Sequence, residues 1–92
     1  MAWLETVDRP AFEQMESAAY MLRHADDPLL VLRALAELRD VREQLELWAV
    51  RDARTRGESW QEIAQALRRP RQAVHRKHRD AAENGDDGSP ST

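Results

Sequence analysis

Apolar side chains recur at steps of three and four residues along most of the chain, which is the periodicity of helices rather than strands. The first such run lies within residues 12–22, and Pro10 stands where a first helical turn accepts proline. We therefore expect a helix that begins at Asp8 or Arg9 and ends near His24. Its apolar stripe consists of Phe12, Met15, Ala19 and Leu22.

A second, much longer helix is predicted after a short break. Asp27 suits the N-cap position and Pro28 the first helical position. No proline or glycine interrupts the chain from there to Arg56, and Gly57 is placed to end the helix in the left-handed conformation. The pattern thus predicts one long central helix.

This long helix carries apolar residues on two sides, and such a helix usually contacts two neighbours. One set follows a heptad seam, whereas Leu35, Leu47 and Val50 lie off it. Two interpretations stay open: the other helices cover both sides, or the seam and the first helix form a homodimer interface. The homodimer is favoured because so short a chain has little material to cover this aliphatic surface. The seam consists of Val31, Ala34, Leu38, Val41, Leu45 and Trp48.

Two short helices are predicted beyond Gly57. Ser59 and Glu62 have the spacing of a capping box, in which each residue satisfies the backbone N–H of the other. Residues 68–70 break the first short helix, and the second runs over residues 71–83. A short helix, a tight turn and a second helix form the helix-turn-helix plan, in which small Ala64 lets the two helices cross closely. The fold class is therefore all-α with four helices.

The net charge of −3 conceals a basic segment. Residues 1–50 hold five arginines against ten acidic residues, and residues 80–92 hold four acidic residues and no basic one. Residues 51–79 hold nine basic residues against three acidic ones, a net charge of +6. A basic block between acidic neighbours is a local electrostatic footprint that favours nucleic-acid binding.

These patterns divide the chain into three parts. Residues 1–57 form an N-terminal arm, the first helix and the long helix, as a scaffold or dimerisation region. We expect residues 45–84 to form a DNA-binding unit that shares the end of the long helix. Residues 85–92 have nothing to bury, and we expect them to form a disordered acidic tail.

The segment around the two short helices resembles the motif of small actinobacterial helix-turn-helix DNA-binding proteins and, more distantly, the DNA-reading region of sigma factors. The resemblance covers about residues 45–80 and implies a fold and DNA binding. It departs at residues 68–70, where Arg-Arg-Pro replaces Gly-Val-Ser. Glycine there supplies a positive φ, so forcing Arg68 into that conformation costs roughly 1 kcal/mol. The matching residues are Ser59, Trp60, Ile63, Ala64, Leu67, Arg71, Gln72, Ala73, Val74, His75, Lys77 and His78.

In such a motif the second helix lies in the major groove, where arginine reads guanine and glutamine reads adenine. Other basic side chains, and the first amides of the capping-box helix, bind phosphate and position the protein. The expected base-facing residues are Arg71, Gln72, His75 and Arg76. The expected phosphate contacts are Arg54, Arg56, Ser59, Trp60, Gln61, Arg68, Arg69, Lys77 and Arg79.

Other chemistry finds little support in the sequence. The chain has no cysteine, and His75 and His78 lack further ligands that would make their spacing a metal site. We expect a surface position for His78, a core position for Trp60, and no enzyme activity, metal or cofactor. No secretion signal or bilayer-spanning run is visible, so the expected location is the cytoplasm, in association with the nucleoid.

Two functions remain in view. The first is a homodimeric transcriptional regulator or nucleoid-associated protein that inserts the 71–83 helix into the major groove of double-stranded DNA. The second is an adaptor that uses the same trihelical unit to bind a component of the transcription machinery. A protein partner could also bind the acidic N-terminal half.

Overall fold

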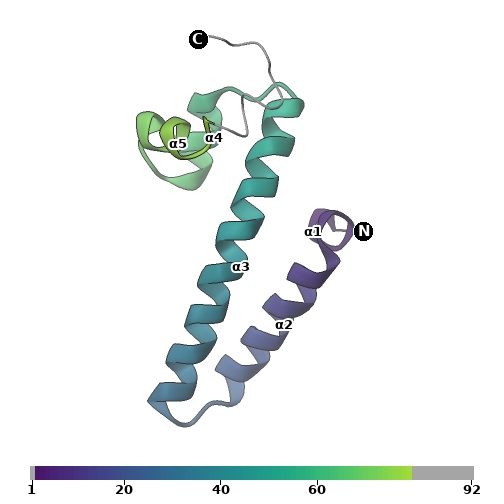
Figure 1. Ribbon diagram of the computed structural model, residues 1–92, viewed down its shortest axis with the longest axis vertical. Helices are drawn as coiled ribbons and strands as arrows, with labels where there is room; N and C mark the ends of the chain where they lie inside the picture. The colour runs from purple at the N-terminus through teal and green to yellow at the C-terminus, as the bar shows by residue number, and fades with distance from the viewer. Residues whose placement is uncertain (1, 80–92) are drawn as a thin grey trace. The chain divides into compact units, whose positions relative to one another are not determined.

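The computed structural model describes residues 2–79, and these residues form helices joined by short turns, without any strand. The all-α class and the long central helix are confirmed. The chain divides into two compact units, Met1–Glu46 and Leu47–Thr92, and the long helix contributes to both. The helices are α1 (Trp3–Val7), α2 (Arg9–His24), α3 (Pro28–Thr55), α4 (Trp60–Leu67) and α5 (Arg71–Lys77) (Figure 1).

The N-terminal arm is itself a helix, so the described residues contain five helices where the sequence predicted four. Asp8 separates α1 from α2 and forms a hydrogen bond at the end of α1 and another at the start of α2. Its N–H donates to the carbonyl oxygen of Leu4 at 3.1 Å, and its side chain accepts from the N–H of Ala11 at 3.1 Å. A helix as short as α1 spans little more than one turn, which is too short for a periodic pattern to reveal.

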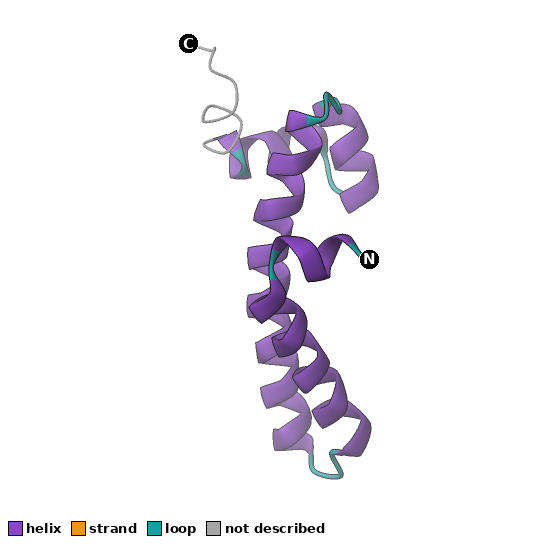
Figure 2. Cartoon of the chain, turned by 90° about the vertical axis from the view of Figure 1, so that its right-hand side faces the viewer, coloured by secondary structure: helices purple, strands orange, loops and turns teal. Residues whose placement is uncertain are grey.

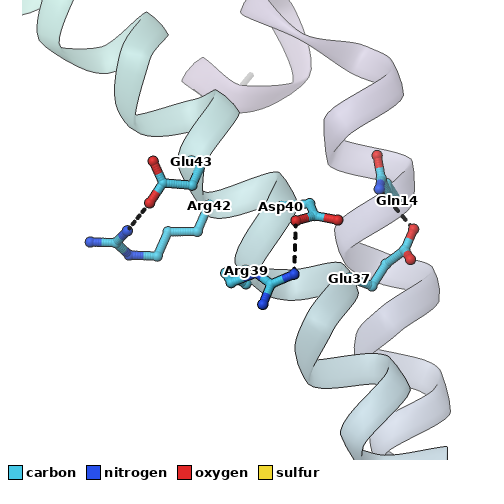
Figure 3. A network of polar contacts seen from close by, with 6 residues as sticks. All are labelled: Gln14, Glu37, Arg39, Asp40, Arg42 and Glu43. Carbon is cyan, nitrogen blue, oxygen red and sulfur yellow. Dashed lines mark hydrogen bonds and ion pairs between the residues drawn. The ribbon is translucent and has the colours of Figure 1, made fainter.

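In the first unit, α2 and the N-terminal part of α3 run antiparallel side by side (Figures 1 and 2). Two hydrogen bonds between side chains tie them together. The amide of Gln14 donates to Glu37 at 2.7 Å (Figure 3), and that of Gln44 donates to Asp8 at 2.6 Å. Small side chains are buried on these helices. They are Ala11, Ala18, Ala34 and Val41.

Part of the heptad seam is therefore buried by packing within a single chain. Val41 is 2% exposed and Ala34 is fully buried, so neither side chain is open to a second copy. Packing within one chain accounts for the burial of both, and the homodimer interface itself stays a prediction. Trp48 lies outside this packing and is 40% exposed. The remaining seam residues, which are half-buried, are Val31, Leu38 and Leu45.

The ends of α3 follow the expected chemistry. The carboxylate of Asp27 accepts from the N–H of Leu29 at 2.8 Å. At the other end, Gly57 has a φ of +93° and the N–H of Glu58 donates to the carbonyl of Ala53 at 2.9 Å, as in a Schellman motif. No helix within residues 2–79 is both long and apolar enough to cross a membrane.

Candidate nucleic-acid interface

The second unit is built on a small apolar core to which the end of α3, α4 and α5 all contribute. Ala64 of α4 is 3% exposed and belongs to the same core as Val74 of α5, and the two helices contact each other. Val74 of α5 is fully buried, which fixes the side of α5 that faces the core. The buried core residues are Val50, Trp60, Ile63, Ala64 and Val74.

Helix α4 begins with the predicted capping box. The N–H of Glu62 donates to Ser59 Oγ at 3.0 Å, and the N–H of Ser59 donates to Glu62 Oε1 at 3.1 Å. The first bond within the helix runs from the N–H of Ile63 to the carbonyl of Ser59 at 3.0 Å. The amides of Trp60 and Gln61 precede this bond and stand at the positive end of the helix dipole, where a phosphate is favoured.

Two carboxylates lie together at this end of α4. A hydrogen bond to Glu62, and the charge of that residue, raise the pKa of Glu58 above its ordinary value of 4.5. The backbone N–H of Ser59 lowers the pKa of Glu62, with further hydrogen bonds from Glu58 and from the Ser59 hydroxyl. Both groups are exposed, so their mutual repulsion at neutral pH acts at the surface of the candidate site.

The turn between α4 and α5 has the strained geometry that the sequence predicted. Arg68 adopts φ 58° and ψ 44°, the left-handed region that glycine occupies at comparable helix ends. Its N–H donates to Gln65 O, and the N–H of Arg69 donates to Ala64 O, both at 3.1 Å. Pro70 then starts α5 without a side-chain cap. The left-handed conformation of Arg68 lets the chain reverse direction tightly between the two helices.

Helix α5 presents the four expected base-facing residues on one exposed face. Successive residues advance by about 100° around an α-helix, so positions 71, 72, 75 and 76 fall within an arc of about 140°. Val74 and half-buried Ala73 lie outside this arc, and so does exposed Lys77. The exposed face, which we call the α5 face, consists of Arg71, Gln72, His75 and Arg76.

The indole of Trp60 lies beneath the α5 face and contacts side chains from two other helices. It is buried, as expected, and its ring centroid lies 4.9 Å from that of His75 in a T-shaped contact. The guanidinium carbon of Arg54 lies 5.0 Å from the Trp60 ring centroid, and Arg54 also donates to Glu58 O at 3.0 Å. Sequence reasoning missed these contacts because they join three segments that are adjacent only after folding.

The expected phosphate-contacting side chains differ in their availability. Arg54 is held against Trp60, and Arg56 forms an ion pair with Asp52 at 3.2 Å. Arg69 is half-buried. Ser59 and Gln61 are exposed at the start of α4, whereas only the backbone amide of Trp60 remains a candidate there, because its side chain lies in the core. The basic candidates that are exposed at either end of α5 are Arg68, Lys77 and Arg79.

Two expectations about the end of α5 need correction. Helix α5 ends at Lys77, because His78 leaves helical geometry with φ −108° and ψ 21°, and residues 80–83 of the expected helix lie outside the described residues. His78 was expected at the surface but is only 4% exposed. Its N–H donates to the carbonyl of Val74 at 3.0 Å, which places it one turn beyond a core residue on the same side. Residues 80–92, with the expected acidic tail, lie outside the described residues.

Within the part of the chain that the structure describes, no three histidine, aspartate or glutamate side chains are grouped as metal ligands would be. Comparisons of the chain with models of protein families, with curated proteins and with solved structures find no match. The case for a function therefore depends on the geometry and charge of α4, the turn and α5.

Proposed function

We propose that this chain is a DNA-binding protein, a transcriptional regulator or nucleoid-associated protein, whose α4–turn–α5 segment acts as a helix-turn-helix. The α5 face carries this proposal. It gathers two guanidinium groups, one carboxamide and one imidazole on the exposed side of a short helix whose other side is fixed in a core. It also lies in a segment of the chain, residues 51–79, with a net charge of +6.

The side chains of the α5 face match the hydrogen-bonding edges of bases in the major groove. Arg71 and Arg76 can each donate two hydrogen bonds to O6 and N7 of guanine, and Gln72 can bind N6 and N7 of adenine. An α-helix with its side chains is about 10–12 Å across, which matches a major groove about 12 Å wide, and the seven residues of α5 extend about 10 Å. Such a short helix contacts only a few base pairs, so affinity must come largely from phosphate.

Phosphate contacts are available on both sides of the α5 face. Arg68 projects from the strained turn before α5, whereas Lys77 and Arg79 are exposed at and beyond its end. The unpaired amides at the start of α4 add a site without a side-chain charge. Contacts of this kind fix the register of the protein on DNA and make its affinity depend on salt.

A pair of substitutions on the α5 face tests the proposal. We expect Arg71→Ala with Arg76→Ala to weaken binding to a fluorescently labelled duplex at least tenfold at low salt, while the circular dichroism stays unchanged. The matched control is Arg9→Ala with Arg23→Ala, which removes the same charge from α2 and should change the affinity less than threefold. Equal losses from the two pairs would show that only net charge matters and would contradict the proposal.

The adaptor is the second candidate, and one observation favours it. Leu47 and Trp48, at the start of the second unit, are large apolar side chains that remain exposed. A protein partner that covered them would be bound mainly through apolar burial, with little dependence on salt. DNA bound through phosphates would instead be released steeply as the salt concentration rises.

We further propose that the regulator acts as a homodimer. Two copies would present two α5 faces to half-sites about one helical turn, or roughly 34 Å, apart on the duplex. Because Ala34 and Val41 of the predicted seam are buried within one chain, the seam alone does not supply the surface that joins the copies.

A further inference from the structure

The N-terminal half of α3 exposes a row of leucines that the fold does not use. Leu29, Leu32 and Leu35 are 62%, 58% and 47% exposed. They follow one another at steps of three residues, and Leu32 lies nine residues before buried Val41, on the opposite side of the helix at about 100° per residue. We call these three residues the leucine stripe. Leu32, at the centre of the stripe, faces away from the packing of α3 with α2.

Opposite charges stand at the two ends of the leucine stripe. Asp26 is exposed just before α3, six residues before Leu32. Arg39 is exposed seven residues after Leu32, and its contact with Asp40 is a 3.5 Å pair between two well-exposed side chains (Figure 3). An exposed pair of this kind contributes little, so Arg39 can reorient toward another carboxylate at small cost.

We propose that a second copy of this chain covers the leucine stripe, with the two α3 helices antiparallel and crossing near Leu32. In this arrangement each stripe buries its leucines against the other, and Asp26 of each copy stands opposite Arg39 of its partner. A two-fold axis requires such self-complementarity, because the same patch must fit itself. A parallel pairing would instead bring like charges together at both ends. This inference rests on the proposed homodimeric regulator and names its interface.

The size of the stripe sets the expected strength of the dimer. Six residues of helix rise only about 9 Å, whereas a stable interface buries about 800 Å² on each partner. The leucine stripe with its charged ends covers less than that. The dimer is therefore reversible, and its population rises over a concentration range from about 5 μM to about 500 μM.

Sedimentation velocity of the full chain without DNA, over that range, tests the pairing. The wild-type protein should shift from monomer to dimer, and Leu32→Lys should raise the dissociation constant at least tenfold. Leu32 is exposed, so the variant keeps its helical circular dichroism. The matched control is Leu47→Lys, an exposed leucine of α3 outside the stripe, which should leave the dissociation constant within threefold of wild type. A wild-type protein that stays monomeric throughout, or equal effects of both lysines, would overturn the inference.

A charge swap tests the antiparallel arrangement. Arg39→Glu alone should weaken the dimer, because it places two carboxylates opposite each other, and adding Asp26→Arg should restore it. Failure of the second substitution to restore the dimer would rule out this register. The mass is measured without DNA, so loss of the dimer and loss of DNA binding are separate results. A protein that dimerises but ignores DNA would contradict the proposed function and leave the interface standing.

Discussion

Arg68 is the only non-glycine residue with a positive φ among residues 2–79. A side chain in the left-handed region costs about 1 kcal/mol because Cβ crowds the carbonyl oxygen, and glycine escapes this cost. Arg68→Gly should therefore raise the free energy of unfolding by about 1 kcal/mol, measured by urea denaturation. A melting temperature equal to or below that of the wild type would contradict this geometry.

Gly57 offers the reverse experiment. Its φ is +93°, and a Cβ added there meets no atom within 4 Å, so substitution strains the backbone without a clash. We expect Gly57→Ala to lower the free energy of unfolding by about 1 kcal/mol. Opposite signs for the two substitutions would show that backbone conformation, and not helix propensity, controls both helix ends.

The raised pKa of Glu58 predicts that the thermal stability of the protein depends on pH. Glu62 raises the pKa of Glu58, so the carboxyl group of Glu58 binds its proton more tightly in the folded chain than in the unfolded chain. At pH values above the pKa of Glu58 in the folded chain, the charged carboxylate therefore destabilises the fold. Glu58→Gln should raise the melting temperature at pH 7, and the gain should vanish as the pH falls below 4.5. Melting followed by circular dichroism measures both. A gain that persists unchanged at low pH would exclude repulsion by Glu62 as its cause.

At the scale of elements, the close contact of α4 with α5 depends on the size of Ala64. A larger side chain there has to push the two helices apart or adopt a strained rotamer, at a cost of about 1–3 kcal/mol. We expect Ala64→Leu to destabilise the protein by that amount. Ala66 lies on the exposed side of the same helix, so Ala66→Leu should change stability by less than about 0.5 kcal/mol. Equal effects would place Ala64 outside the contact.

Most helix ends could be read from the sequence because local chemistry defines them. Pro28 and Gly57 mark the two ends of α3, and the capping box of Ser59 and Glu62 marks the start of α4. Helix α1 could not be predicted, since a single turn leaves no periodicity. The early end of α5 was missed because no proline or glycine stands near His78.

The α5 face was also predictable, since helical spacing alone places its four residues together. The contacts beneath it were not. Arg54, Trp60 and His75 come from three helices, and only the tertiary fold brings their side chains into contact. The burial of Val41 was likewise ambiguous, because a heptad seam looks the same whether the partner helix comes from the same chain or from another.

In the molecule as a whole, the first half of the chain and residues 51–79 differ in charge and in proposed role. The acidic first half holds the leucine stripe, the proposed contact between two copies, and the basic residues 51–79 hold the α5 face, the proposed contact with DNA. The acidic charge of the first half also repels phosphate, so DNA is expected to bind residues 51–79 rather than the first half.

The affinity for a DNA duplex as a function of salt concentration tests whether the α5 face and the basic residues beside it bind DNA. If Arg68, Lys77 and Arg79 each neutralise one phosphate, the logarithm of the association constant should fall with the logarithm of salt concentration at a slope of about −3. Replacing Lys77 by alanine should make that slope shallower by about 1. Absence of binding to any duplex at low ionic strength, or a slope near zero, would contradict the account.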